Sequence, residues 1–525
     1  MNRVLNIFVV SVISLVISTG NTASNNGVPT KVYKTPEGTL SIEPERSDRK
    51  DDRLESLGSP LGSGGKFPLP VHLPTPYPAV RELAIPSGDR SLKTRLVAMG
   101  DTHGDFDTMV KLLSSPRVGI INKNLEWVGG NTQFVVNGDL LDRGAGSRKI
   151  MDLLMALEEQ APKAGGAVHV LIGNHELMNL LGDLSYVGKD EMHQYHVNRT
   201  EWQQSLDNIE GFYTRSEKPK GMAEYYNQKF IDHVRSTSAF NSFLYGLLGG
   251  ITIGKIDENG LSQIKDEIKK LALESMEKKY TPAFVGHRHA FSSQGKYGKW
   301  IRKHSALVKV GNSIFMHGGI SERFSNLSYE QLKSLCDEDF AEFFNLVDEL
   351  VASNSYNIHF DGRDLRGFIE ENRYNSKLDK KFADIITRLD TLLTTSPFFA
   401  NDGVLWDRTL ATGGNSTGDW EGVFGGIFSS GDPTKERLEK ILHLNNVERI
   451  VLGHTVTPSR RIESKYDNQL WLIDVGMNKT YAHGLPQVLE ITPTSTRTIT
   501  TSEEIYHKKQ PQTLPLPQQE PQFNQ

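Results

Sequence analysis

The chain has 525 residues, of which 37% are hydrophobic and 23% are charged, and its formal net charge at pH 7 is −5. This composition is ordinary for a soluble globular protein with a buried core. Acidic and basic residues are interspersed along the chain, so nucleic acid is not an expected partner.

The N-terminal segment has the pattern of a secretory signal. Asn2 and Arg3 form a short positive region, and residues 5–17 are almost purely apolar. That run is shorter than the roughly 20 apolar residues of a membrane span, and small polar residues follow it, with cleavage expected near Ala23. We therefore expect residues 1–23 to be a signal peptide and the protein to be exported, either periplasmic or secreted. The alternative is that this segment stays uncleaved as an N-terminal anchor. Unless it does, no stable membrane partner is expected.

Two further segments are rich in residues that bury little surface. Residues 24–90 contain much Pro, Gly, Ser and charge, and they are expected to form a linker or an extended arm. Residues 508–525 are rich in Pro and Gln and are expected to be disordered. The globular domain is therefore expected within residues 91–495.

Short apolar runs inside this domain end in glycine, which is typical of buried strands. The runs cover residues 96–99, 134–136 and 168–172, and further strand signals cover residues 307–315, 450–452 and 470–473. Helical periodicity follows the second run, at residues 150–157. Strands that alternate with helices favour a layered α/β domain, in which the loops at the carboxyl ends of the strands gather into one crevice.

Two long helical segments interrupt this pattern, at about residues 186–279 and 322–395. In the second segment, Phe382, Ile386, Leu389 and Leu393 recur at helical spacing. We expect both segments to be insertions that cap the α/β core, not separate domains.

The sequence contains one cysteine, Cys336, so an intrachain disulfide is impossible. Cysteine-dependent phosphatases need an arginine six positions after the nucleophile, and Glu342 stands there. Cys336 lies in an amphipathic stretch and is interpreted as a core or surface thiol.

Five polar clusters follow apolar runs and carry side chains that bind metals or phosphate. They are Asp101-Thr-His103-Gly-Asp105, Gly138-Asp139-Leu-Leu-Asp142-Arg143-Gly144, Gly173-Asn174-His175-Glu176, His317-Gly318-Gly319 and Gly453-His454-Thr455. Carboxylate, imidazole and amide oxygen together suit Mn, Fe or Zn and suit Ca or Cu(I) poorly. Because each cluster follows a strand, we expect all five to meet at one edge of the sheet.

The residue types are those that phosphate ester hydrolysis requires. A phosphate dianion repels an attacking hydroxide, and two divalent metal ions both neutralise that charge and generate the nucleophile near neutral pH. A carboxylate must bridge the two ions, and Asp139 is the expected bridge. The other expected ligands are Asp101 and His103 for the first metal, and Asn174, His317 and His454 for the second.

The same clusters supply groups for the substrate. Arg143 can hold the phosphate bidentately, and Asn174 is a second candidate for phosphate contact. His175, oriented by Asp142, can protonate the leaving oxygen as a general acid while a metal-bridging hydroxide attacks phosphorus in line. The expected catalytic residues are therefore His175 and Asp142.

In these motifs the sequence resembles the calcineurin-like metallophosphoesterases, and within them the PPP-type phosphatases. The match runs over about residues 95–491 in motif order. It is closest to the Shewanella-like protein phosphatases in Gly-Asn-His-Glu-Leu-Met-Asn-Leu-Leu-Gly-Asp-Leu at residues 173–184 and Leu-Trp-Asp-Arg at residues 405–408. The resemblance implies the ligand roles given above and adds Arg408 as a second phosphate-binding arginine. It also implies a four-layer α/β/β/α sandwich with helical insertions, where the strand pattern alone would allow a doubly wound sheet.

A second histidine motif, Gly286-His287-Arg288-His289, looks like the closing ligand motif of many metallophosphoesterases. It precedes the His317 cluster, which is the wrong order for a last motif. The Gly453-His454 cluster follows a strand and stands where the last motif belongs. We therefore expect His287 and His289 not to be ligands.

The leading hypothesis is a metal-dependent phosphoprotein phosphatase that acts on phosphotyrosine or phosphoserine/threonine in a protein or peptide. The first alternative is a hydrolase of small phosphorylated molecules such as dinucleoside polyphosphates, although diadenosine-tetraphosphate hydrolases typically carry alanine where Gly318 stands. The second alternative is a non-catalytic metal-binding adaptor. The presence of every candidate ligand, of both arginines and of His175 argues against it.

Overall fold

The computed structural model describes residues 30–34, 40–44, 89, 91–214, 273–359, 365–414 and 432–500, together with isolated residues between 222 and 271. The predicted signal peptide at residues 1–23, most of the predicted linker at residues 24–90 and the predicted tail at residues 508–525 lie outside the described residues. So does much of the first predicted insertion.

The chain divides into two compact units. The first comprises Met1–Tyr77, Tyr213–Arg215 and Glu224–Lys279. Its described strands, β1 (Thr30–Lys34) and β2 (Leu40–Pro44), pair antiparallel within the range expected to be a linker. The second unit comprises Pro78–Phe212, Ser216–Ala223 and Tyr280–Gln525, and it contains all five polar clusters.

The first of two sheets described in the second unit has the strand order β12-β11-β3-β4-β5. Its centre is formed by three parallel strands, β3 (Leu96–Met99), β4 (Gln133–Val136) and β5 (Ala167–Val170). Two antiparallel strands extend it, β11 (Gln487–Ile491) and β12 (Thr496–Thr500). All four residues of β3 are buried, which agrees with the continuous apolar run of the sequence.

The second sheet has the order β6-β7-β8-β10-β9. Here too three parallel strands form the centre, β7 (Ser313–Met316), β8 (Arg449–Leu452) and β10 (Leu470–Leu472). The edge strands β6 (Leu307–Val310) and β9 (Glu463–Lys465) run antiparallel. Both sheets are therefore mixed, and each presents the carboxyl ends of three parallel strands.

One asparagine joins the two sheets at those ends. Asn137, directly after β4, donates from Nδ2 to the carbonyl oxygens of Met316 (2.8 Å) and Val451 (3.3 Å), which lie in the second sheet. Because the bonds are buried, they fix the lateral position of one sheet on the other.

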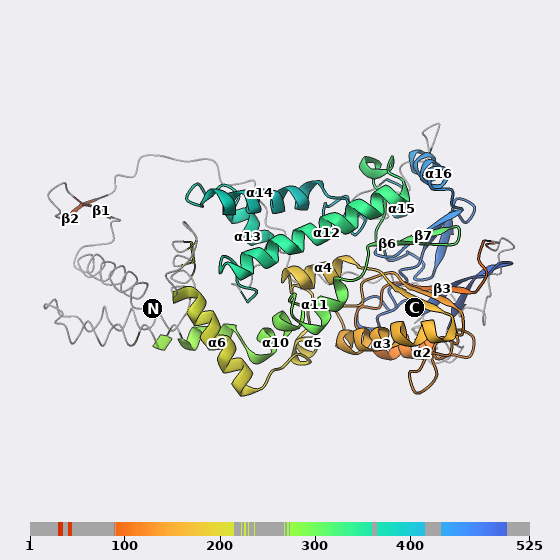
Figure 1. Ribbon diagram of the computed structural model, residues 1–525, viewed down its shortest axis with the longest axis horizontal. Helices are drawn as coiled ribbons and strands as arrows, with labels where there is room; N and C mark the ends of the chain where they lie inside the picture. The colour runs from red at the N-terminus through yellow and green to blue at the C-terminus, as the bar shows by residue number, and fades with distance from the viewer. Residues whose placement is uncertain are drawn as a thin grey trace, which may run out of the picture. The chain divides into compact units, whose positions relative to one another are not determined.

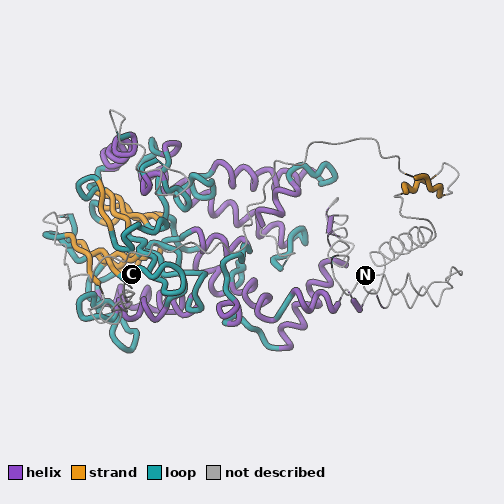
Figure 2. The backbone as a smooth tube through the Cα atoms, turned by 180° about the vertical axis from the view of Figure 1, so that it is seen from behind, coloured by secondary structure: helices purple, strands orange, loops and turns teal. Residues whose placement is uncertain are grey.

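Helices cover the outer faces, as Figures 1 and 2 show for α2 (Phe106–Leu113) and α3 (Ser147–Gln160) along the first sheet and α16 (Pro433–Asn445) beside the second. The side chain of Asp105 caps α2 by accepting from Thr108 N–H at 3.1 Å. Helix α3 buries the face that the sequence predicts, namely Ile150, Leu153, Leu154 and Leu157. The predicted α/β/β/α sandwich is confirmed.

The remaining described helices lie at three places in the sequence, namely before β5, between β5 and β6, and between β7 and β8. They are η1 (Ala161–Ala164), α4 (Asn174–Leu181), α5 (Lys189–His193), α6 (Arg199–Thr214), α10 (Pro282–Ala290), α11 (Lys296–Ile301), η2 (Glu322–Phe324), α12 (Tyr329–Ala352), α13 (Leu365–Asn372), α14 (Lys380–Thr395) and α15 (Thr409–Thr412).

The predicted second insertion is helical, with α12 and α14 packed together. In α14 the buried face includes Phe382, Ile386 and Leu389, as predicted, while Leu393 is only partly buried. Cys336 lies inside α12 as a buried free thiol whose pKa is raised by burial and by Asp337, as fits a core residue. Among the described residues, no helix combines the length and apolar character that a membrane crossing requires.

Candidate metal centre

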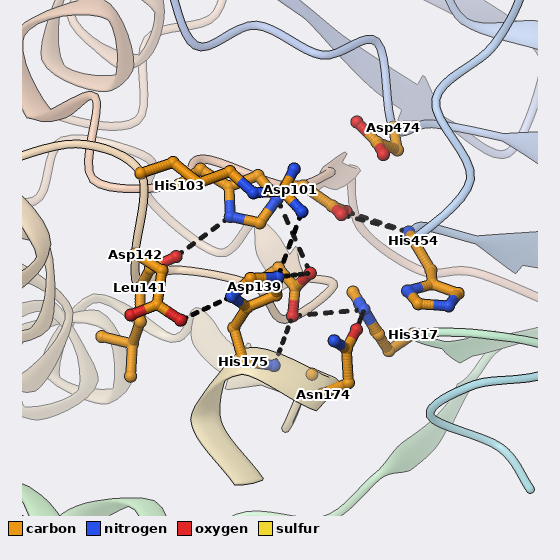
Figure 3. A network of polar contacts seen from close by, with 12 residues as sticks. Asp101, His103, Asp139, Leu141, Asp142, Asn174, His175, His317, His454 and Asp474 are labelled. Carbon is orange, nitrogen blue, oxygen red and sulfur yellow. Dashed lines mark hydrogen bonds and ion pairs between the residues drawn. The ribbon is translucent and has the colours of Figure 1, made fainter. Parts of the chain in front are cut away.

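All five polar clusters meet at the carboxyl ends of the parallel strands. Asp101 follows β3, Asp139 follows β4, Asn174 follows β5, His317 follows β7 and His454 follows β8. Figure 3 shows these side chains and those of His103 and His175 gathered around Asp139. The structure thus brings together every ligand residue that the sequence predicts.

Asp139 is the centre of the arrangement. Its Oδ1 lies 3.2 Å from His317 Nε2, and its Oδ2 lies 3.7 Å from His103 Nε2 and 3.9 Å from His175 Nε2. Among the described residues, two groups of three side chains lie close enough to hold a metal ion: His103, Asp139 and His175, and Asp139, His317 and His454. The two groups share Asp139, which is the position a bridging carboxylate must occupy.

Backbone carbonyl groups orient two of the histidines. His103 Nδ1 lies 3.0 Å from Leu141 O, and His317 Nδ1 lies 2.8 Å from Asn137 O. A ring that donates Nδ1–H to a carbonyl keeps a lone pair on Nε2, and this support is typical of metal-binding histidine. In both residues that Nε2 faces Asp139.

The surroundings of His454 show whether the residues present fit a bound metal ion. Its Nε2 is buried and finds no hydrogen-bond partner within the described part of the chain. A buried unpartnered imidazole nitrogen is unfavourable unless something else binds it. Because His454 forms one of the two groups with Asp139 and His317, a divalent cation fits the residues present.

Asp101 lies beside this cluster and interacts with Asp474, a carboxylate that was not among the predicted site residues. Both Asp101 oxygens accept the backbone N–H of His454 at 3.2 Å. Burial and the neighbouring charge of Asp474 raise the pKa of Asp101 well above its usual value. Asp474 follows strand β10 as the other clusters follow theirs, so the rule used for them would also have found it.

The charges of the cluster favour bound cations. Burial opposes the charge of Asp139, but His317 and His175 outweigh it and hold the pKa of Asp139 well below its usual range. Burial likewise opposes the charge of His317, and the carboxylates of Asp139 and Asp101 raise its pKa to about 10. The two carboxylates thus favour a proton on His317 when no cation is bound. Metals that bind at such ligands displace protons of this kind.

His175 forms a hydrogen-bonded pair with Asp142. Its Nδ1 lies 2.5 Å from Asp142 Oδ2, and Asn179 Nδ2 donates to the other oxygen at 3.0 Å. Burial lowers the pKa of His175, but the charges of Asp139 and Asp142 more than offset this, so the net pKa is raised. The arrangement keeps a proton available on a ring whose Nε2 faces the cluster.

The phosphate-binding candidates also border the cluster. Arg143 Nη2 lies 3.3 Å from His175 Nε2. Arg408 Nη1 donates to His454 O at 2.8 Å and to Thr455 Oγ1 at 3.2 Å. Asn174 Oδ1 lies 2.9 Å from His317 Nε2. The structure places all three residues at the site, and their roles as ligands of metal or phosphate stay predictions.

The backbone of the site is strained. Five of its residues that are not glycine have positive φ angles, a conformation that costs about 1–3 kcal/mol each and clusters at functional sites. They are His103 (44°), Asp139 (49°), Asp142 (69°), Arg143 (66°) and His454 (63°). Gly173 is required at its position because a Cβ there would lie 2.3 Å from Asp139 Oδ1.

Glu176 is a second residue without a role in the sequence analysis, although it stands in the third cluster. Its buried carboxylate accepts the backbone N–H groups of Gly173 (2.7 Å), Asp139 (2.9 Å) and Leu140 (2.8 Å). Burial and the charge of Asp139 raise its pKa to about 7. Glu176 thereby fixes the loop that carries Asp139.

The Gly286-His287-Arg288-His289 motif lies elsewhere, inside helix α10. His287 is buried against Tyr195, with ring centroids 4.8 Å apart, and stacks on Phe291 at 4.5 Å. Neither His287 nor His289 belongs to a group of metal-binding side chains among the described residues.

The chain is similar in sequence to known phosphoesterases. The calcineurin-like phosphoesterase family matches residues 94–298. The chain is 24% identical over 416 residues to Shewanella-like protein phosphatase 2 of Arabidopsis thaliana, which covers 78% of each protein. It is 23% identical over 397 residues to Shewanella-like protein phosphatase 1 of Plasmodium berghei, covering 75% of this chain and 69% of the relative.

Among solved structures, the cold-active protein-tyrosine phosphatase of a psychrophilic Shewanella species is similar, with a TM-score of 0.40 and 18% identity. The similarity covers 91% of this chain and 96% of that one. The family that the motifs predict is thus the one whose model matches residues 94–298, and over most of its length the chain is distantly similar to Shewanella-like protein phosphatases.

Proposed function

We propose that the protein is a dinuclear metal-dependent phosphatase that hydrolyses phosphate monoesters on proteins or peptides. One observation carries the proposal: the carboxylate of Asp139 belongs to both groups of side chains that can hold a metal ion. A shared carboxylate is what a two-metal site needs, and a site for one ion needs none.

The residues divide between two cations as the sequence suggests. Asp101, His103 and Asp139 would hold the first, and Asp139, Asn174, His317 and His454 would hold the second. Mn, Fe or Zn suit this mixture of carboxylate, imidazole and amide ligands. When bound, the pair supplies positive charge for the phosphate and makes a water more acidic.

The chain's own residues supply the remaining functions. Arg143 and Arg408 border the cluster from different loops, and each offers a guanidinium that can hold phosphate oxygens. His175 donates the proton that the leaving oxygen requires, and Asp142 fixes its ring through the 2.5 Å contact at Nδ1.

A protein or peptide substrate is supported by the relatives, two of which are named as protein phosphatases. The test is hydrolysis by the purified full chain with and without Mn²⁺. A panel of phosphotyrosyl and phosphoseryl peptides and diadenosine tetraphosphate would be compared at equal concentration. Metal-dependent release of phosphate from peptides is expected.

Other results would contradict the proposal in different ways. Faster cleavage of the dinucleotide would indicate a small-molecule hydrolase. Absence of turnover with any divalent metal would indicate an adaptor that has kept the scaffold.

We also propose that the chain is exported, on the strength of the apolar run at residues 5–17 that follows Arg3. N-terminal sequencing of the protein recovered from the cell exterior or periplasm is expected to begin near residue 24. Recovery from the cytosol with an intact N-terminus would contradict export.

A further inference from the structure

Two tyrosine rings contact the guanidinium of Arg143 at the border of the metal centre. The Cζ atom of Arg143 lies 3.9 Å from the ring centroid of Tyr481 and 5.4 Å from that of Tyr186. The ring of Tyr186 also lies 5.1 Å from that of His175, and the ring of Tyr481 lies 6.0 Å from that of His103. The two tyrosines come from loops nearly 300 residues apart in the sequence and meet at one arginine.

Hydrogen bonds to backbone carbonyl groups hold the segments of both tyrosines in place relative to Arg143. The N–H of Arg143 donates to Tyr186 O at 3.1 Å. Thr480, next to Tyr481, donates from Oγ1 to Arg143 O at 3.3 Å. Asn478, two residues earlier, donates to the carbonyl oxygen of His103. The positions of the two rings are therefore set by the same loops that form the metal centre.

Both rings remain open to solvent beside a buried cluster. Tyr186 and Tyr481 are each 50% exposed, whereas Asp139 and His175 are almost completely buried. Half-exposed aromatic rings next to a charged site are suited to contact with a ligand, because a ring offers apolar area with little conformational freedom to lose.

We propose that Tyr186 and Tyr481 form an aromatic collar that selects aromatic phosphate esters, so that the preferred substrates are phosphotyrosyl peptides. This inference rests on the proposed function, because it needs a phosphate held by Arg143. In phosphotyrosine the phenyl ring is attached directly to the ester oxygen. A phosphate on Arg143 thus places that ring beside the collar, while the short methylene of phosphoserine leaves the collar unfilled.

The contact energy sets the size of the expected effect. A well-placed aromatic pair changes an equilibrium or a kcat/KM by up to about tenfold. Loss of a ring also removes a restraint on Arg143, which lowers kcat/KM for every phosphate ester alike. The ratio of kcat/KM for phosphotyrosyl to phosphoseryl peptide cancels that shared loss and isolates the collar.

The experiment compares Tyr481→Leu, Tyr186→Leu and the double variant with the parental full chain loaded with Mn²⁺. Two peptides of the same sequence, one phosphotyrosyl and one phosphoseryl, are the substrates. We expect the ratio to fall by about three- to tenfold for each single variant, with the larger fall at Tyr481, and to be kept by Tyr481→Phe. Unchanged ratios in both leucine variants would overturn the proposal.

Tyr374 provides a matched control. It is 84% exposed, and the guanidinium of its neighbour Arg373 lies 5.0 Å from its ring centroid. It lies two residues after α13, a helix that carries none of the residues of the metal centre. Tyr374→Leu is expected to leave the ratio unchanged. An equal fall in this variant would mean that the ratio does not report the collar.

A binding measurement separates failure of the collar from failure of the proposed function. Calorimetric affinities of the metal-loaded chain for phenylphosphonate and methylphosphonate are compared in the same variants. We expect phenylphosphonate to bind more tightly to the parent and the difference to shrink in Tyr481→Leu. If peptides are not hydrolysed but the phosphonate affinities behave as expected, only the proposed function is contradicted. Equal affinity for both phosphonates in the parent would contradict the collar, whatever the activity.

Discussion

Two Gly-His pairs occupy very different regions of the protein. Gly453-His454 lies directly after strand β8, with His454 in the left-handed region at φ 63°. Gly286-His287 lies in the middle of helix α10. Both histidines are buried, and in both burial lowers the pKa of the ring.

The difference lies in their surroundings. His454 faces His317 and Asp139, and its backbone N–H binds Asp101. His287 packs between aromatic rings beside Arg288, whose charge further lowers its pKa. The comparison teaches that a dipeptide and burial do not define a metal site. A histidine at the carboxyl end of a parallel strand is better placed to bind a metal ion, because there it meets carboxylates from neighbouring strands.

The largest expected effect is at the carboxylate that His454 faces and His287 lacks. Asp139→Asn keeps the shape of the side chain but removes the charge shared by both groups. We expect kcat/KM for p-nitrophenyl phosphate to fall by about 10⁴-fold, since two-metal catalysis supplies several kcal/mol. Metal analysis should show fewer than two ions per chain. Parental activity in this variant would refute the two-metal proposal.

The next effect concerns a histidine of the site that we assign to proton transfer. His175→Gln is expected to reduce kcat for a phosphopeptide by about 10²- to 10³-fold, which is typical of general acid catalysis. The loss should be much smaller for p-nitrophenyl phosphate, because its leaving oxygen needs little protonation. Steady-state kinetics with both substrates measure this difference. Equal losses for the two would instead favour His175 as a metal ligand, as its place in the group with His103 and Asp139 allows.

Much of this site could be predicted from the sequence, because each cluster comes directly after a strand. Parallel strands place their carboxyl ends at one edge, so Asp101, Asp139 and Asn174 could be expected to meet before any coordinates were known. The order of motifs along the chain likewise separated His454 from His287. The two-sheet core followed only from the resemblance to a known family, because period-two patterns do not say which strands share a sheet.

Other parts of the site have no local signal. Tyr186 and Tyr481 meet at Arg143 only through loops that are remote in sequence, and exposed tyrosines are common. Asn137 stands just before the second cluster, and its bonds to the second sheet depend on how the two sheets pack. Glu176 stands within the third cluster, and its bonds to the loop of Asp139 depend on the pairing of the neighbouring strands β4 and β5. Strands β9, β11 and β12 were missed because they carry few consecutive apolar residues or lie at edges.

A paired substitution tests the comparison directly. His454→Phe is expected to weaken metal binding and activity by at least about tenfold, because a ligand is lost where supporting residues alone contribute about 10- to 100-fold. His287→Phe should leave metal content and kcat/KM within about twofold, since the ring keeps its place against Phe291 in a volume-conserving swap. Metal titration and kinetics on both variants measure the contrast. A loss of metal in His287→Phe would show that the helix motif contributes to the site.

The smallest effect is expected at Glu191, which interacts both with Asp142 of the metal centre and with Tyr195 beside His287. Glu191 lies in α5, accepts the N–H of Asp142 at 3.3 Å, and its charge acts on Tyr195, which packs on His287. Burial and the charge of Asp142 raise the pKa of Glu191 from 4.5 to about 8. Between pH 4.5 and about 8, the folded protein therefore keeps a proton on Glu191 that the unfolded chain has released. The stability that this proton contributes is complete below pH 4.5 and is lost as the pH rises through about 8.

Glu191→Gln mimics the protonated side chain and does not titrate, so the variant should retain that stability at high pH. We expect the Tm difference between variant and parent to grow from about pH 5 to about pH 9 and to level off above the folded pKa. Thermal unfolding of the metal-loaded chains across this range measures it, with Glu159→Gln on the exposed face of α3 as the control. A pH-independent difference would mean that Glu191 is already ionised in the folded state. The carboxylate of Asp142 would then face a second negative charge, and His175 would be the more readily protonated for it.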